Sequence, residues 1–347
     1  MDLTKFIRPN ILKMKAYSSA RDEFEGEGEV FLDANENPYE TGINRYPDPY
    51  QRALKKKVAA LKNIAIENTF LGNGSDEAID LILRIFCEPG KDKILTTDPT
   101  YGMYEVSAAI QNVETTKVPL NELFELSSRA ILDAADEFTK VIFICTPHNP
   151  TGTDLAREEL IQLLKKFNGL VVIDEAYVDF TDQPSFVNDL KDYPNLIVLQ
   201  TFSKAWGMAG LRLGMAFASE EIIDYFNKVK PPYNLNILTQ KEALSRLDNK
   251  PGVDRMIREL MSEKEKLSTL LQAFDFVLKV YPSAANFLLV KFKDSSKAFH
   301  YLLEHDVIVR DRSKALHCEN CLRITIGTVD ENKELIATLN SFQALTD

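Results

Sequence analysis

A lysine follows a short apolar run near the middle of the chain, within the sequence Thr201–Gly207. The run before it, Leu196–Leu199, is rich in β-branched and leucine residues and predicts a buried strand. A lysine at the carboxyl end of such a strand lies where open α/β sheets bind ligands. Partial desolvation would lower its pKa and make its amine available for Schiff-base chemistry. Lys204 is therefore a candidate catalytic residue.

Two neighbours of Lys204 carry the donors that a phosphate group needs. Ser203 offers a hydroxyl, and Arg212, eight residues after the lysine, offers a guanidinium fork. A second candidate phosphate site is the run Gly72–Glu77, where glycines allow a tight turn and Ser75 or Asp76 would cap the helix that follows. This run lacks the third glycine of a dinucleotide fingerprint, which argues against NAD. A single Ser-Lys pair is usually a solvated turn, so the prediction depends on the other motifs.

Two further apolar runs, Val141–Cys145 and Leu170–Ile173, also end in polar turns. A predicted helix over residues 157–167 separates them, which gives the β-α-β rhythm of a parallel sheet buried on both faces. The carboxyl ends of parallel strands meet at one edge, so we expect one crevice there. The side chains expected in it are Asn149, Asp174, Tyr177 and Lys204. Taken alone, Asp174 could instead be a buried carboxylate that caps a neighbouring loop.

Composition limits the possible functions. A length of 347 residues suggests about two domains. The net charge of −11 argues against broad binding to nucleic acids or anionic membranes. Neither a signal peptide nor an apolar run of the ~18 residues that span a bilayer is evident, so we expect a cytoplasmic protein. The pair Cys318 and Cys321 lacks the further ligands that zinc needs, so we expect an unliganded loop and no metal site.

The remaining pattern divides the chain into three parts. Residues 1–30 read as an N-terminal arm, 31–250 as a large domain, and 251–347 as a small domain to which the arm contributes. Strands are expected at Phe31–Leu32, Lys93–Thr96, Ala285–Val290 and Leu322–Gly327. Helices are expected at 51–62, from Gly74 onward, at 253–274 and at 297–304.

In combination, the motifs resemble those of the class I/II, fold-type I aminotransferases, which depend on pyridoxal 5'-phosphate (PLP). The matching elements are Gly72–Glu77, Pro99-Thr100-Tyr101, Asn149–Gly152, Asp174–Tyr177, and Ser203-Lys204 with Gly210-Leu211-Arg212. The resemblance implies an α/β fold. Its large domain would have a mostly parallel central sheet flanked by helices, beside a smaller α+β domain.

The resemblance also implies catalytic roles for Lys204, Asp174 and Tyr177. Lys204 would hold PLP covalently and later move a proton, while Asp174 would keep the pyridine nitrogen protonated so that the ring accepts carbanion charge. Tyr177 and Asn149 would hydrogen-bond the phenolic oxygen of the ring, and Tyr101 would lie on its face. The other residues implied to bind the cofactor are Gly74, Ser75, Asp76, Ser203, Arg212 and, from a neighbouring subunit, Tyr46.

Arg323 bears on the substrate because it lies inside an otherwise apolar predicted strand. A charge there requires a partner, either an internal salt bridge or a substrate anion. In related aminotransferases the matching arginine holds the α-carboxylate of an amino acid. Together with Tyr17, Arg310, Arg45–Pro49 and Tyr233–Asn236, it resembles the histidinol-phosphate aminotransferase family from about residue 7 to residue 329.

That resemblance implies a reaction between L-histidinol phosphate and 2-oxoglutarate, giving imidazole-acetol phosphate and L-glutamate in histidine biosynthesis. Tyr17, Arg310, Arg323 and Asn149 would contact the substrates, and family members are homodimers. Three alternatives stay open: an aromatic or broad-specificity aminotransferase, a threonine-phosphate decarboxylase on the same scaffold, and a cofactor-binding regulator. The acidic charge and the absence of a DNA-binding module before Phe31 in this sequence disfavour the regulator.

Overall fold

Apolar runs without polar interruptions form the central strands because helices cover both faces of the sheet. The computed structural model describes residues 3–18 and 30–346. In β4, Val141 and Phe143 pack into one apolar core, whereas Ile142 and Ile144 pack into another on the opposite face. This separation follows from the alternation of side chains along a strand.

The larger sheet has seven strands in the order β1-β7-β6-β5-β4-β2-β3. The pairs from β6 through β5, β4 and β2 to β3 are parallel, and β7 is antiparallel to both β1 and β6. The strands are β1 (Thr69–Asn73), β2 (Lys93–Asp98), β3 (Glu114–Pro119), β4 (Thr139–Cys145), β5 (Leu170–Asp174), β6 (Leu196–Thr201) and β7 (Leu213–Phe217).

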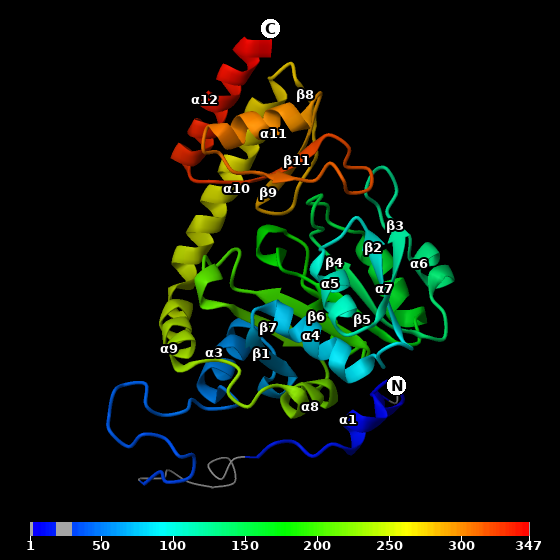
Figure 1. Cartoon of the computed structure of the whole chain (residues 1–347), viewed down its shortest axis with the longest axis vertical. Helices are drawn as coiled ribbons and strands as arrows, with labels where there is room; N and C mark the ends of the chain where they lie inside the picture. The colour runs from blue at the N-terminus through cyan, green and yellow to red at the C-terminus, as the bar shows by residue number, and fades with distance from the viewer. Residues whose placement is uncertain (1–2, 19–29, 347) are drawn as a thin grey trace.

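The smaller sheet is antiparallel, in the order β10-β11-β9-β8. Its strands are β8 (Val277–Val280), β9 (Phe287–Phe292), β10 (Arg310–Asp311) and β11 (Cys321–Thr325). Helices α10 (Lys250–Gln272), α11 (Ser295–Glu304) and α12 (Val329–Thr346) contribute side chains to the core on one face of this sheet. Figure 1 shows α10 running from the large sheet to the small one along one side of the molecule.

The remaining helices lie around the large sheet. They are α1 (Pro9–Lys13), α3 (Arg52–Lys62), α4 (Ser75–Phe86), α5 (Met103–Ile110), α6 (Ser128–Ala134), α7 (Arg157–Lys166), α8 (Glu220–Val229) and α9 (Ile237–Arg246). Helices α4, α5 and α8 pack on one face, and α3, α6, α7 and α9 on the other. Short 3-10 turns lie at Leu3–Lys5, Ile66–Asn68, Val178–Phe180, Phe186–Asp189, Ala209–Leu211 and Leu247–Asn249.

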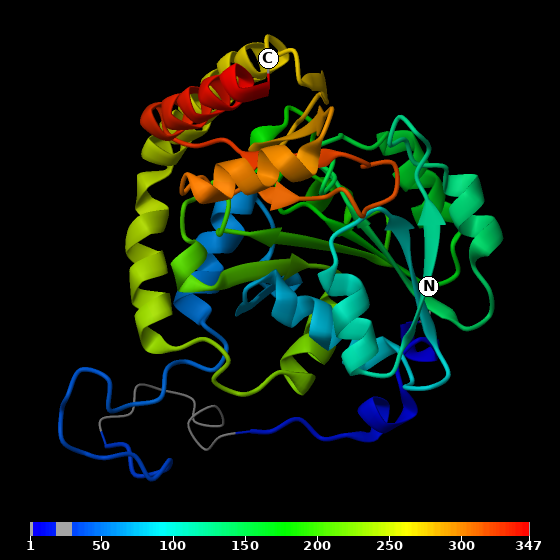
Figure 2. The ribbon, with the colours of Figure 1, turned by 45° about the horizontal axis from the view of Figure 1, so that its top comes forward.

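Most expected elements are present, with two corrections. The strand expected at Phe31–Leu32 is wrong, because this stretch forms no strand and Leu32 is 86% exposed. The segment 30–47 extends away from the sheets in both views (Figures 1 and 2). The cap expected at Ser75 or Asp76 is also wrong, because Gly74 is the N-cap of α4. The domain bounds 31–250 and 251–347 stay predictions.

Candidate active site

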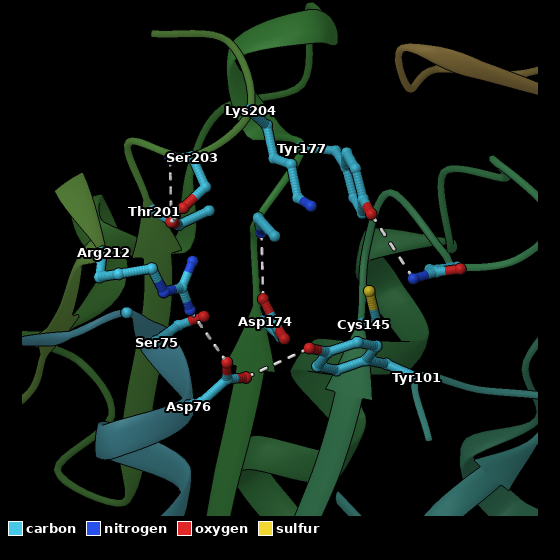
Figure 3. A pocket seen from close by; sticks show the side chains of 13 residues that line it. Ser75, Asp76, Tyr101, Cys145, Asp174, Tyr177, Thr201, Ser203, Lys204 and Arg212 are labelled. Carbon is cyan, nitrogen blue, oxygen red and sulfur yellow. Dashed lines mark hydrogen bonds and ion pairs between the residues drawn. The ribbon is translucent and has the colours of Figure 1, made fainter. Parts of the chain in front are cut away.

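Lys204 lies in the turn that follows β6, at the carboxyl edge of the large sheet. Its side chain reaches into a cavity towards Asp174 (Figure 3), and its Nζ lies 5.8 Å from the centre of the Tyr177 ring. Desolvation and then the charge of Arg323 lower the pKa of Lys204, against the opposing pull of Asp174. A lowered pKa increases the share of neutral, nucleophilic amine near neutral pH.

One end of the cavity carries phosphate-type donors. Ser75, Ser203 and Arg212 lie on the same side in Figure 3. Helix α4 begins at Ser75 without a side-chain cap, so the amide groups of its first turn are open to an anion. The Arg212 Nη2 lies 3.4 Å from Asp76 Oδ2. Ser203 is held by Thr201, whose Oγ1 accepts from the Ser203 amide at 3.1 Å.

Two glycines permit this close arrangement. Gly74 has φ +76°, which L side chains rarely adopt, and a Cβ there would lie 2.7 Å from Arg212 Nη2. A Cβ at Gly214, on β7, would overlap the backbone of Gly74 and Ser75. Gly214 lies directly opposite Gly72 in the β1–β7 pair. The antiparallel strand β7 therefore holds the start of α4 against the turn that carries Arg212.

Asp174 is the last residue of β5 and is only 2% exposed. Its Oδ2 accepts a hydrogen bond from the Tyr104 hydroxyl at 2.7 Å, and its Oδ1 accepts from the Ala176 amide at 3.1 Å. Burial raises the pKa of Asp174 to about 6, although both hydrogen bonds oppose this rise. Asp174 is thus a buried carboxylate facing the cavity, with its orientation fixed by two donors.

The opposite side of the cavity connects the large sheet to the small one. Tyr177 is 6% exposed, and the Asn149 Nδ2 approaches its hydroxyl at 3.5 Å. Asn149 also accepts a hydrogen bond at 2.6 Å from Nη1 of Arg323, which lies on β11. The Arg323 guanidinium carbon lies 5.3 Å from the centre of the Phe287 ring. No carboxylate forms an ion pair with Arg323 in the part of the chain that the structure describes.

The cavity brings together most of the candidates that the sequence predicted. Those that line it are Gly74, Ser75, Asp76, Tyr101, Asn149, Asp174, Tyr177, Ser203, Lys204 and Arg212. Arg323 is joined to it through Asn149. Arg310 lies on β10 directly opposite Arg323 but is exposed and does not line the cavity.

Two predicted residues lie elsewhere in the single chain. Tyr17 is 66% exposed and does not line the cavity. Tyr46 is 50% exposed and stacks on Tyr233 at 4.3 Å, also away from Lys204. Tyr46 was expected to act on a neighbouring subunit, which a single chain does not test.

Sequence reasoning assigned no role to Cys145, Ala176 or Thr201, which also line the cavity. It also missed Tyr104, which contacts Asp174. Tyr104 lies on α5, three residues after Tyr101, and the two rings meet edge to face at 5.5 Å. The only indication in the sequence was a second tyrosine at helical spacing from Tyr101, and this pattern is equally typical of a core residue. Only the fold shows that its hydroxyl reaches Asp174.

The cysteine pair is buried and reduced. Burial raises the pKa of Cys318 to about 12 and that of Cys321 to about 11, which keeps both as thiols. Within residues 3–18 and 30–346, no group of three His, Cys, Asp or Glu side chains could hold a metal ion. A search of the same residues finds no helix long and apolar enough to cross a membrane.

Comparison with known proteins relates the chain to one family. The model of the aminotransferase class I and II family matches residues 29–339. A curated histidinol-phosphate aminotransferase of Parabacteroides distasonis is 52% identical over 342 residues, 99% of each chain. The crystal structure of histidinol-phosphate aminotransferase from Sinorhizobium meliloti with pyridoxal-5'-phosphate has a TM-score of 0.79 at 22% identity, over 87% of this chain and 84% of that one.

A third similar protein, the L-threonine-O-3-phosphate decarboxylase of Porphyromonas gingivalis, has a TM-score of 0.73 at 26% identity, over 87% of this chain and 91% of that one. The predicted fold is confirmed, since this chain has the large, mostly parallel sheet and the small second sheet and resembles these neighbours over 87% of its length. The chain therefore belongs to the class I and II aminotransferases, which are PLP-dependent enzymes.

Proposed function

We propose that this enzyme is a histidinol-phosphate aminotransferase. It would transfer the amino group between L-histidinol phosphate and 2-oxoglutarate, giving imidazole-acetol phosphate and L-glutamate in histidine biosynthesis. The observation that carries the proposal is 52% identity to a relative of that name over 99% of both chains. The decarboxylase neighbour is only 26% identical.

The polar groups of the cavity fit the phosphate of PLP. Ser75 and Ser203 would donate their hydroxyls, Arg212 its guanidinium, and the first turn of α4 its uncapped amides. The glycines at 74 and 214 leave room for this approach. Asp76 would balance the charge of Arg212 and accept from the Tyr101 hydroxyl, at 3.2 Å.

The ring end of the cofactor fits the other side. When bound, PLP supplies an electron sink for the carbanion that forms at the substrate Cα. Asp174, buried and ionised above pH about 6, would hold a proton on the pyridine nitrogen. Tyr177 and Asn149 would hydrogen-bond the phenolic oxygen, and Tyr101 would support the ring face.

Lys204 would hold the cofactor covalently through Nζ and be displaced by the amine of the substrate. Its freed amine would then take the proton from the substrate Cα and return it on the cofactor side. The lowered pKa of Lys204 suits a base that works near neutral pH. Nearby Asp174 and Tyr177 would hold the cofactor ring in position without taking up this proton.

The substrate would bind between the two sheets. Arg323, already oriented by Asn149, would take a carboxylate or phosphate with its free donors. Arg310, opposite Arg323 across the β10–β11 pair, would add a second positive charge. Tyr17 would close over the same group.

A homodimer and a cytoplasmic location also stay predictions. The segment that carries Tyr46 has a row of exposed apolar side chains, including Leu32 at 86%, Tyr39 at 78% and Ile43 at 62%. Exposed apolar surface of this kind is typical of a protein interface. In a dimer, Tyr46 would reach the cofactor phosphate of its partner.

A substrate comparison tests the proposal. Purified PLP-loaded protein is assayed for glutamate formation when 2-oxoglutarate is supplied with L-histidinol phosphate, phenylalanine or tyrosine, and for CO₂ release from O-phospho-L-threonine. We expect kcat/KM for histidinol phosphate to exceed that for either aromatic amino acid at least ~10-fold, because the phosphate meets the arginines. Equal or greater activity with an aromatic amino acid, or CO₂ release as the main reaction, would reject the proposal.

A further inference from the structure

Three arginines share one face of the small sheet. Arg310 lies directly opposite Arg323 in the antiparallel β10–β11 pair. The Arg312 amide donates to the Cys321 carbonyl at 2.9 Å, which continues this ladder by two residues. Because side chains alternate along a strand, Arg310, Arg312 and Arg323 project from the same side of the two strands. We call these three residues the arginine face.

The arginine face looks towards the large sheet rather than into the small-domain core. Arg323 reaches Asn149, beyond the carboxyl end of β4. Cys321, opposite Arg312, packs with the core of the large sheet. Leu322 and Ile324 alternate with Cys321 and Arg323 along β11. They pack into the separate core beneath α10, α11 and α12. The arginine face therefore lies on the side of the small sheet that is turned towards the large sheet, with Arg310 exposed on the edge strand.

Among the described residues, the guanidinium of Arg312 has a buried donor that is not satisfied. Its Nε is buried with no hydrogen bond, and no carboxylate pairs with any of the three arginines, in the parts of the chain that the structure describes. Desolvation and the charges of Arg323 and Arg310 lower the pKa of Arg312. A half-buried cation beside two like charges is unfavourable unless an anion joins it.

We propose that Arg312 is a third guanidinium of the substrate-binding site and a specificity-determining residue for the phosphate monoester of the substrate. The inference rests on the proposed function, which supplies a phosphorylated substrate. A carboxylate satisfies its two oxygens on one guanidinium fork. A phosphate monoester carries about −1.5 to −2 charges and three acceptor oxygens, so it can use more guanidinium groups at once. Arg312 thus strengthens phosphate binding more than carboxylate binding.

The first test measures anion binding without turnover. Inorganic phosphate is titrated into PLP-loaded protein, in which the cofactor's own phosphate site is filled, and the thermal unfolding midpoint is followed at constant ionic strength. Arg312→Gln should raise the phosphate concentration for a half-maximal shift about tenfold. Arg312→Lys should raise it less, because the charge is kept and the fork is lost.

The second test separates the two substrates. Arg312→Gln should raise KM for histidinol phosphate about tenfold and KM for glutamate in the reverse reaction less than about threefold. Lys314→Gln is the matched control, because Lys314 is an exposed cation two residues further on. It should change neither constant and leave phosphate binding as in the wild type.

The outcomes distinguish this inference from the proposed function. If Arg312→Gln binds phosphate as the wild type does, or if KM rises equally for both substrates, Arg312 is not the specificity residue. If the wild type fails to convert histidinol phosphate but still binds phosphate through Arg312, the assigned substrate is wrong. In that case the arginine face serves another phosphate ester.

Discussion

The cavity at the large sheet and the arginine face of the small sheet differ in how far their charged side chains have partners within the protein. In the cavity, the two acidic side chains have partners of their own: Asp174 accepts from Tyr104 and the Ala176 amide, and Asp76 accepts from Tyr101. On the arginine face, no carboxylate pairs with a guanidinium in the portion that the structure describes. The two regions are joined by the hydrogen bond between Arg323 and Asn149.

The difference suggests two kinds of ligand. Groups that are oriented in advance suit a cofactor that stays bound, because little reorganisation is needed when reaction occurs. Cations without a carboxylate partner suit an anion that enters and leaves in each cycle, because they lose no ion pair when it binds. Changes in the cavity should therefore affect cofactor retention and rate, whereas changes on the arginine face should affect substrate affinity.

The largest effect is expected at Lys204. Lys204→Ala removes the amine that would hold the cofactor and move the proton, so we expect kcat to fall about 10⁴-fold. Borohydride reduction followed by peptide mapping should label Lys204 in the wild type and no residue in the variant. Lys314→Gln, an exposed lysine, is the control. An active variant that still carries the label would contradict the assignment.

Asp174 comes next. Asp174→Asn keeps the shape but cannot ionise, so we expect kcat to fall about 10³-fold with some cofactor still bound. The pKa of Asp174 is raised from 3.8 to about 6 by folding. The folded state thus binds the proton more tightly, and stability falls as pH rises from about 4 to 6. Cofactor-free wild type should lose about 3 kcal/mol relative to Asp174→Asn across this window.

Chemical denaturation of both cofactor-free proteins at pH 4, 5, 6 and 7 measures this difference. The wild type should become less stable relative to the variant as the pH rises. Parallel curves would show that Asp174 has an ordinary pKa in the folded protein. The claim that the cavity holds a carboxylate with a raised pKa would then be wrong.

The sequence predicted the cavity because its residues follow three adjacent parallel strands. β4, β5 and β6 are long apolar runs, and each ends in a turn that carries a polar candidate. Local pattern and topology agree there, so the order of strands and turns along the chain was enough to place Asn149, Asp174 and Lys204 together.

The arginine face was harder to predict because it depends on contacts between distant segments. β10 has only two residues, and the alternation of Arg310 and Arg312 is visible only once β11 pairs with it. The same limit explains Phe31–Leu32, where an apolar pair has no strand to join in the single chain. Tyr104 was missed because a buried aromatic on a helix usually serves packing alone.

A smaller effect is expected for Arg323, which connects the two regions. Arg323→Gln removes a charged donor to Asn149 and would remove the proposed contact to the substrate, so kcat/KM should fall about 10²-fold. The loss should lie mainly in KM for both substrates. Cofactor retention, measured by absorbance after gel filtration, should match the wild type. Loss of cofactor instead would show that the two regions do not act separately.

The smallest effect is expected for Tyr104→Phe, which removes one hydroxyl and keeps the ring stacked on Phe143 at 5.0 Å. Asp174 then loses its donor at 2.7 Å, so its pKa should rise further above about 6. The pH-dependent loss of stability in cofactor-free protein should extend to higher pH, and kcat should fall about tenfold. Tyr301→Phe is the control, because the Tyr301 hydroxyl has no hydrogen bond among the described residues. If both variants show the wild-type pH profile, Tyr104 only fills the core, and Asp174 does not depend on it for its charge.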